Sequence, residues 1–267
     1  MMRVLSLGAG VQSTAMALMA AHGEITPMPD CAIFADTGAE PRSVYEHLCW
    51  LSSGNVLPFP VHVVRFKDGL TKNIEASVAG GRFAGAPFFA QTGRGAGMLR
   101  RQCTPEFKIQ PILAKVRELV GLTHRQIGPK KPIVEQWIGI SLDEAIRAKP
   151  SRVRWITHRW PLLERRMHRR DCLNWLTSMG YARPPRSACV YCPYRSNEEW
   201  RVLRDSPPDW DEATRIDRLI RTGVRGTRDP LYCHRSLKPL AEVDLSTDED
   251  RGQINLFNNE CEGMCGV

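Results

Sequence analysis

The chain has 267 residues, a net charge of +8 and a pI near 9.2, which favours a polyanionic partner, either nucleic acid or a multiply phosphorylated nucleotide. Its length can bury a full core, and no secretory signal or apolar run near the roughly 18 residues of a membrane span is visible, so we expect no membrane partner. Nine cysteines without a signal peptide predict a reducing, cytoplasmic compartment in which thiols serve metals or catalysis.

Apolar runs and helical periodicities alternate along the first half of the chain. Strands are predicted at 3–7, 31–35, 61–65 and 134–140, and helices at 13–22, 41–53 and 105–120. This alternation predicts an α/β fold with a doubly wound, Rossmann-like parallel sheet and helices on both faces. The glycine-rich residues 79–102 are predicted to form a mobile loop. We expect a nucleotide-binding domain at 1–149 and a helical, cysteine-bearing elaboration packed on it at 150–267.

The first predicted strand runs directly into the small residues Gly8, Ala9 and Gly10 and then into a helix. Glycines let the backbone approach a ligand, and the positive end of a helix attracts anions, so this turn is a candidate phosphate cradle. A Walker loop is excluded because no lysine follows Gly10. A dinucleotide fingerprint is excluded because Ser13 stands where a third glycine is needed. An ordinary strand-to-helix turn remains the alternative.

Polar residues also follow the second predicted strand, and a lysine begins a later helix. Asp36 at the carboxyl end of a strand can hold Mg²⁺ or a ribose hydroxyl, and a simple helix cap is the alternative. Lys108, one turn after Pro105, is placed to bind a phosphate or sulfate, or else is an exposed helix charge.

Cys189 and Cys192 lie two residues apart in a Cys-x-x-Cys-Pro turn. Two thiolates at this spacing can bind one metal centre with little rearrangement. The same spacing occurs in zinc knuckles and in redox pairs, so the motif alone does not choose among them.

In their order along the chain, these motifs resemble the PP-loop ATP pyrophosphatases, and among them the branch of phosphoadenylyl-sulfate (PAPS) reductases and DNA phosphorothioation ATPases. The family loop reads roughly Ser-Gly-Gly-x-Asp-Ser-Thr, from which Gly8, Ala9 and Gln12 depart. Asp-Thr-Gly, Cys-x-x-x-x-Lys and Gly-Ile-Ser-x-x-Glu follow it. The resemblance implies nucleotide contacts from Ser6, Gly8, Ala9, Gly10, Gln12, Ser13, Thr14, Asp36, Thr37, Gly38, Gly139 and Glu144.

The resemblance also implies a [4Fe-4S] cluster on Cys103, Cys189 and Cys192, with Zn²⁺ as the alternative. Thr104 stands where adenylyl-sulfate reductases carry a further cysteine, so the fourth ligand is open. Cys172 is the first candidate. Cys261 and Cys265 are others, and so is an open iron site like that of tRNA thiolases.

The implied reaction is the binding of ATP with Mg²⁺, the adenylation of an acceptor with release of pyrophosphate, and iron–sulfur-dependent sulfur transfer. Lys108, Cys261 and Cys265 are the expected catalytic residues. One alternative is a thiol-dependent reductase that releases sulfite from PAPS or adenylyl sulfate, with Cys265 or Cys261 as the attacking thiol. Another is a non-catalytic nucleotide or nucleic-acid binding module, which Gln12 in place of an aspartate favours.

The expected partners follow from charge and from the same resemblance. Arginines between 147 and 170 alternate with Trp155 and Trp160, a pattern that suits phosphate pairing and base stacking on an acceptor such as tRNA or DNA. A solvated helix face with core tryptophans is the alternative. The resemblance further implies a sulfur donor or thiol reductant protein, and it leaves a homodimer open.

Overall fold

The computed structural model describes residues 1–83, 85–92, 95–123, 125–227, 229–247, 250 and 252. Unit 1 comprises Met1–Asp36, Arg42–Phe66 and Lys108–Ser187, and unit 2 comprises Thr37–Pro41, Lys67–Phe107 and Ala188–Val267. This division differs from the predicted boundary after residue 149. A strand at 156–159 joins the main sheet and keeps residues 150–187 in unit 1, while residues 67–107 belong with the C-terminal part of the chain.

Unit 1 is built on a five-stranded parallel sheet with the strand order β3-β2-β1-β6-β7. The strands are β1 Met2–Leu7, β2 Cys31–Asp36, β3 Val61–Arg65, β6 Val134–Ile138 and β7 Ile156–Arg159. In the register, Leu5 of β1 lies opposite Ala32 of β2 and Trp137 of β6. The expected α/β fold with a parallel sheet is therefore confirmed, and β7 is a strand that the sequence reasoning missed.

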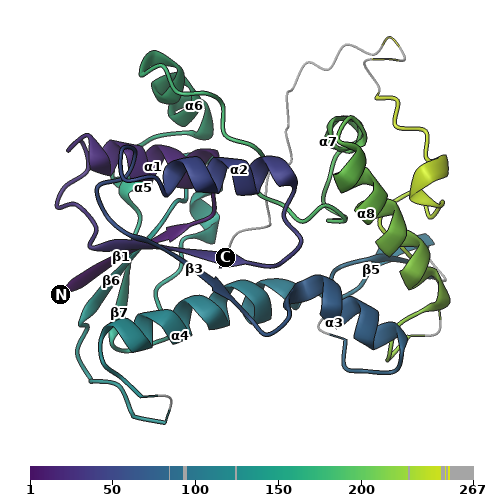
Figure 1. Ribbon diagram of the computed structural model, residues 1–267, viewed down its shortest axis with the longest axis horizontal. Helices are drawn as coiled ribbons and strands as arrows, with labels where there is room; N and C mark the ends of the chain where they lie inside the picture. The colour runs from purple at the N-terminus through teal and green to yellow at the C-terminus, as the bar shows by residue number, and fades with distance from the viewer. Residues whose placement is uncertain are drawn as a thin grey trace. The chain divides into compact units, whose positions relative to one another are not determined.

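Helices cover both faces of this sheet, with α1 and α2 on one face and α4 on the other (Figure 1). The helices of unit 1 are α1 Val11–Ala21, α2 Arg42–Leu51, α4 Gln110–Leu119, α5 Pro161–Glu164 and α6 Arg169–Ser178. Alternate strand residues explain the two layers: Leu5 packs in one core with Met16 of α1, and Val4 packs in the other with Val116 of α4. Because β2 is buried on both faces, it is apolar almost throughout.

Unit 2 contains a small antiparallel sheet with the strand order β5-β4-β8. Its elements are α3 Gly69–Val78, β4 Phe89–Thr92, β5 Gly95–Met98, α7 Asn197–Arg204, α8 Pro207–Leu219 and β8 Leu231–Tyr232. The prediction of a loop at 79–102 is wrong, because β4 and β5 pair within it. Glycines weaken the strand signal in sequence, but β4 also gains β8 as a partner from far along the chain.

The remaining turns are short. A π-helical turn at Pro105–Ile109 leads into α4, and 3₁₀ turns lie at Leu142–Arg147, Ile220–Thr222 and Leu240–Glu242. Within the ranges given above, none of the helices has the length and apolar character needed to cross a lipid bilayer.

Candidate functional site

The turn between β1 and α1 lies where the strand order of the sheet reverses. From β1 the sheet continues through β2 and β3 on one side, and through β6 and β7 on the other. In open parallel sheets of this kind, ligands bind beyond the carboxyl ends of the strands at this switch point. The loop at 8–10 and the segment at 139–144, which follow β1 and β6, are therefore the two walls of the candidate site.

The hydroxyl of Ser13 organises the loop. Its Oγ accepts hydrogen bonds from the backbone N–H groups of Gly8, at 3.1 Å, and Gly10, at 3.3 Å. The N–H of Thr14 donates to the carbonyl of Gly10 at 2.9 Å and so begins the helical pattern of α1. The first N–H groups of a helix have no intrahelical acceptor, which leaves donors at this turn for an anion.

Ala9 has a left-handed backbone conformation, with φ of +54°. This region favours glycine, and an L-residue there costs roughly 1–2 kcal/mol. The nucleotide contact that the resemblance implied for Ala9 stays a prediction. Strained backbone of this kind is found preferentially at ligand sites.

Gly139 brings the end of β6 against the first turn of α1. A Cβ added at Gly139 would lie 3.1 Å from the backbone nitrogen of Ser13 and 3.2 Å from its Cα. Only a residue without a side chain fits this approach without displacing the helix backbone. The approach is consistent with the predicted role of Gly139 as part of the site wall.

Gln12 joins three segments of unit 1 at this point. Its Nε2 lies 3.4 Å from Ser141 Oγ and 3.5 Å from Glu144 Oε2, and its Oε1 accepts a hydrogen bond from Arg169 Nη1 at 3.1 Å. Arg147 Nη1 in turn pairs with Glu144 Oε1 at 2.5 Å. Burial raises the pKa of the Glu144 carboxyl, and Arg147 opposes that shift. Two guanidinium groups thus stand beside the loop, where they can pair with phosphates.

Arg169 is a site residue that sequence reasoning missed. It was grouped only with the basic segment at 147–170, because nothing in its neighbours along the chain indicates where its side chain lies. The contact depends on α6 packing beside α1, a tertiary arrangement that no local pattern encodes.

Two residues that were predicted to contact a nucleotide, Ser6 and Thr14, have hydrogen-bond partners within unit 1. Ser6 Oγ accepts a hydrogen bond from Gln136 Nε2 at 2.8 Å. Thr14 is fully buried, and its Oγ1 lies 3.0 Å from Nε2 of His47 on α2. Burial lowers the pKa of His47 to about 4, so its imidazole is neutral near pH 7. Direct nucleotide contact by Ser6 and Thr14 stays a prediction.

Asp36 is buried at the end of β2, and both of its carboxylate oxygens have protein partners. Tyr45 donates to Oδ1 at 2.8 Å, and Arg65 Nε donates to Oδ2 at 3.1 Å. Asp36, which was predicted to hold Mg²⁺ or a ribose hydroxyl, is thus paired with the positively charged Arg65 guanidinium. A role of Asp36 toward Mg²⁺ or a ribose is untested, and it would require these contacts to open.

Three other predicted residues lie in turns. Thr37 donates to Glu40 Oε1 at 3.3 Å, and Gly38 has φ of +70°, a conformation that glycine tolerates. Both belong to unit 2, as part of the short segment 37–41. Lys108 lies in the π-helical turn before α4, at the start of a unit 1 segment. Its catalytic role stays a prediction.

The cysteine turn in unit 2 is held by its own backbone and by one buried arginine. The N–H of Cys192 donates to the carbonyl of Cys189 at 3.0 Å. Arg195 Nη2 donates to the carbonyls of Ala188, at 2.7 Å, and Cys189, at 3.1 Å, and this guanidinium side chain is only 9% exposed. Cys189 Sγ lies 3.5 Å from Thr37 Oγ1.

The predicted metal ligands belong to both units, Cys172 to unit 1 and Cys103, Cys189 and Cys192 to unit 2. Over the ranges that the structure describes, no three His, Cys, Asp or Glu side chains form a group that could hold a metal ion. Cys172 is fully buried in the apolar core that contains α1, and burial raises the pKa of its thiol to about 12. A ligand needs the thiolate, which this environment disfavours. Cys172 is therefore a poor candidate for the fourth ligand, and a metal centre on Cys103, Cys189 and Cys192 stays a prediction.

The two thiols predicted to attack sulfur, Cys261 and Cys265, lie outside the described residues. They were also offered as a fourth cluster ligand, and that alternative is untested for the same reason.

Part of the basic segment at 147–170 contributes to the core and to ion pairs within the chain. Trp155 is 4% exposed and packs in the α4-side core with Val134 and Ile156, so it cannot stack on a base. Arg159 pairs with Glu164 at 2.8 Å. This part of the nucleic-acid prediction is corrected to the core role that the sequence left open.

The chain was compared with family models, with curated proteins and with solved structures. No family model matches the chain, and no curated protein matches it. Among solved structures, the phosphate complex of PAPS reductase from Candida auris is similar, with a TM-score of 0.42 and 9% identity over 68% of this chain and 74% of that chain. A similarity of this degree identifies neither a reaction nor a site residue of this chain.

Proposed function

We propose that the chain is a PAPS reductase-like enzyme of the PP-loop type, which binds ATP at the switch point of unit 1 and adenylates an acceptor with release of pyrophosphate. The observation that carries the proposal is the convergence at Gln12 of the loop after β1, the segment after β6 and the start of α6. Three segments remote in sequence meet beside a turn with free helix N–H groups, at the edge where such sheets bind nucleotides.

In the proposed reaction, an acceptor oxygen attacks the α-phosphorus of ATP. The new oxygen–phosphorus bond forms as the bond between the α-phosphorus and its bridging oxygen breaks, and pyrophosphate leaves with the bonding electron pair. A phosphate oxygen would replace the Ser13 hydroxyl on the N–H groups of Gly8 and Gly10. Arg147 and Arg169 would stabilise the charge that develops on the leaving pyrophosphate.

Gln12 acts in this scheme as a positioning residue. A neutral amide accepts a hydrogen bond from Arg169 without cancelling its charge, whereas the aspartate of the family pattern would form an ion pair with it. With glutamine at this position, the Arg169 guanidinium meets a neutral amide in place of a carboxylate.

The net charge of +8 supports nucleic acid as the adenylated acceptor. Sulfur transfer to that acceptor is what the family resemblance implies next. The cluster that the resemblance implies is untested, and no step of the proposed reaction depends on it.

The proposal is tested by ATP binding and pyrophosphate release in matched loop variants. A Cβ at Gly10 would lie 3.8 Å from Ser187 Cβ, an ordinary contact, so Gly10→Ala should fold normally. Gly10→Val places a branched side chain in the phosphate space, and we expect ATP affinity to fall at least about tenfold, or about 1.4 kcal/mol, without loss of the fold. Calorimetry gives the affinity and urea unfolding checks the fold.

Three outcomes distinguish the proposed enzyme from the alternative functions. Unchanged ATP affinity in Gly10→Val would contradict the site. ATP binding without pyrophosphate release, with or without added RNA or DNA, would leave a binding module. Sulfite release from PAPS in place of pyrophosphate release from ATP would identify the reductase.

A further inference from the structure

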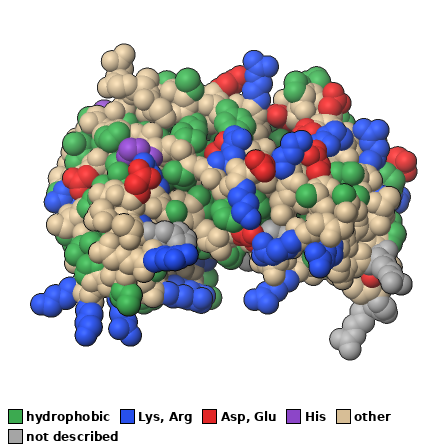
Figure 2. Space-filling model, turned by 60° about the horizontal axis from the view of Figure 1, so that its bottom comes forward, with side chains coloured by type: hydrophobic (Ala, Val, Ile, Leu, Met, Phe, Trp, Pro, Cys, Tyr) green, Lys and Arg blue, Asp and Glu red, His purple; other side chains and the backbone are tan. Residues whose placement is uncertain are grey.

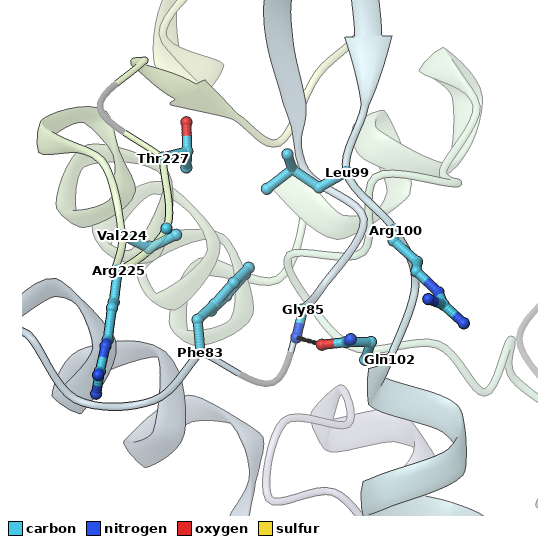
Figure 3. A pocket seen from close by; sticks show the side chains of 9 residues that line it. Phe83, Gly85, Leu99, Arg100, Gln102, Val224, Arg225 and Thr227 are labelled. Carbon is cyan, nitrogen blue, oxygen red and sulfur yellow. Dashed lines mark hydrogen bonds between the residues drawn. The ribbon is translucent and has the colours of Figure 1, made fainter.

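Unit 2 contains a cavity of about 180 Å³ that the proposed reaction does not use. Phe83, which precedes β4, Leu99, which follows β5, and Val224, from the segment before β8, surround it in Figure 3. A cavity of about 150 Å³ is enough to hold benzene, so this space takes one aromatic ring. It is too small for a complete nucleotide with its phosphates.

The lining of the cavity suits a planar heterocycle. The Phe83 ring points into the space between Leu99 and Val224 (Figure 3). It also stacks on Phe88, at an interplanar angle of 18° with the ring centroids 6.3 Å apart. Gln102 Oε1 accepts the N–H of Gly85 at 3.2 Å, and among the described residues its Nε2 has no protein acceptor. An apolar, aromatic wall with one available amide donor matches the face and the edge of a nucleobase.

Two cations flank the cavity. Arg100 and Arg225 line it on opposite sides in Figure 3, and both side chains extend outward. Neither forms an ion pair within the part of the chain that the structure describes, whereas the neighbouring Arg82 is paired with Glu106. Lys and Arg side chains project at many places on the face shown in Figure 2, so charge alone would not single out this site. What distinguishes it is a ring-sized apolar cavity flanked by two guanidinium groups that have no ion-pair partner among the described residues.

We propose that this cavity binds one unstacked base of a single-stranded nucleic acid, with the phosphates on either side of that base held by Arg100 and Arg225. Cations on both sides fit a chain that continues in both directions better than a mononucleotide, whose phosphates lie on one side of the base. A base within a duplex cannot enter, because its partner and neighbours shield it. The inference rests on the proposed function in one respect, because it names the acceptor class for that enzyme.

The test measures fluorescence anisotropy with labelled single-stranded RNA and DNA oligonucleotides and the corresponding duplexes. The double variant Arg100→Gln/Arg225→Gln should bind single strands at least about tenfold more weakly. Its plot of log affinity against log salt concentration should be shallower by about 0.7 for each of the two lost phosphate contacts. Arg204→Gln/Arg235→Gln removes the same charge from two exposed unit 2 arginines outside the cavity, and it should change affinity less than about twofold.

A second variant tests the base pocket separately from the charge. Leu99→Trp, at a half-buried position, fills the cavity and should weaken single-strand binding about tenfold while leaving the salt dependence unchanged. Ultraviolet cross-linking of an oligonucleotide that carries 5-iodouracil should label the peptide containing Phe83 or Leu99. Urea unfolding midpoints close to that of the wild type establish that each variant is folded.

The proposal is overturned if the wild type binds no oligonucleotide, binds duplex as well as single strands, or keeps full affinity in folded Leu99→Trp. It is also overturned if AMP occupies the cavity and the polymer does not. Gly10→Val should keep oligonucleotide binding, and Leu99→Trp should keep ATP binding. Unchanged ATP affinity in Gly10→Val would therefore contradict the ATP site and leave this inference standing, whereas an unaffected oligonucleotide affinity in Leu99→Trp would overturn this inference and leave the ATP site standing.

Discussion

The switch-point site of unit 1 and the cysteine turn of unit 2 satisfy their polar groups in different ways. At the switch point, Gln12 contacts Glu144 and Arg169, which lie more than one hundred residues away in sequence. In the cysteine turn, Arg195 donates to carbonyls six and seven residues away, and Cys192 donates to Cys189. The cysteine turn also contacts a distant segment, since the N–H of Val190 donates to the carbonyl of Ala39 at 2.8 Å. The two regions differ in the groups involved: charged side chains meet Gln12 at the switch point, whereas Arg195 binds backbone carbonyls of its own turn.

This difference shows why the two motifs have such different value as evidence of function. Hydrogen bonds within a turn stabilise that turn, and they are found whether or not a ligand binds. Polar groups that converge from several strands at a sheet edge serve no single element, and such convergence is typical of binding sites. The Cys-x-x-Cys spacing does not choose between metal and redox roles, whereas at the loop the fold brings Glu144 and Arg169 to Gln12.

The largest expected effect concerns Cys172, which was predicted to be a ligand but lies in the unit 1 core. A pKa raised from 9.0 to about 12 lowers the thiolate fraction about a thousandfold, and full burial adds steric protection. We expect iodoacetamide to modify Cys172 in the native protein at least about a thousandfold more slowly than the exposed Cys49. Peptide mass spectrometry after timed alkylation measures both rates.

Urea-unfolded protein provides the control, because both thiols should then react at similar rates. Modification of native Cys172 as fast as Cys49 would mean that this core opens readily, and the ligand role would return.

The next effect tests how far the cysteine turn depends on Arg195. Arg195→Met leaves the carbonyls of Ala188 and Cys189 without their buried donor, which should lower the free energy of unfolding by about 2–4 kcal/mol. Arg201→Met is the matched control, since it breaks the more exposed ion pair with Asp250 and should cost no more than about 1 kcal/mol. Urea unfolding compares them, and equal losses would contradict a special role for Arg195.

A third effect tests the close approach of β6 to α1. Gly139→Ala pushes a methyl group against the Ser13 backbone, which cannot move independently of the helix, and should destabilise unit 1 by about 1–3 kcal/mol. Gly10→Ala adds the same methyl where ordinary contact distances remain, and should change stability by less than about 0.5 kcal/mol. Similar unfolding midpoints for the two variants would show that the two walls of the site are not in tight contact.

Much of the parallel sheet was predictable because its physics is local. Strands buried on both faces are continuous apolar runs, as at 31–35, and the helices between them have their own periodicity. The loop after β1 was predictable for the same reason, since small residues between a strand and a helix indicate a tight turn. The left-handed conformation of Ala9 was not predictable, because an alanine does not indicate a positive φ.

The rest depends on tertiary contacts that no local pattern reports. Arg169 is one of many arginines in its segment, and only the packing of α6 beside α1 brings it to Gln12. Cys172 falls on the buried side of the same helix, so one element carries both a site residue and a core thiol. The hairpin of β4 and β5 was hidden by its glycines and is completed by β8, more than 130 residues further along the chain.

The smallest effect concerns His47, whose ring lies 3.0 Å from the Thr14 hydroxyl in unit 1. Burial lowers its pKa from 6.5 to about 4, so the folded state resists protonation that the unfolded state accepts. The stability from neutral His47 is therefore full above pH 6.5 and is lost as the pH falls toward 4; for this partly exposed ring we expect about 1 kcal/mol between pH 7.5 and 5. Unfolding free energies at both pH values should show a smaller loss in His47→Gln. His234 of unit 2 also has a pKa lowered by burial, so His234→Gln is the comparison: if it alone removes the pH dependence, acid sensitivity belongs to unit 2 and not to the helix behind the loop.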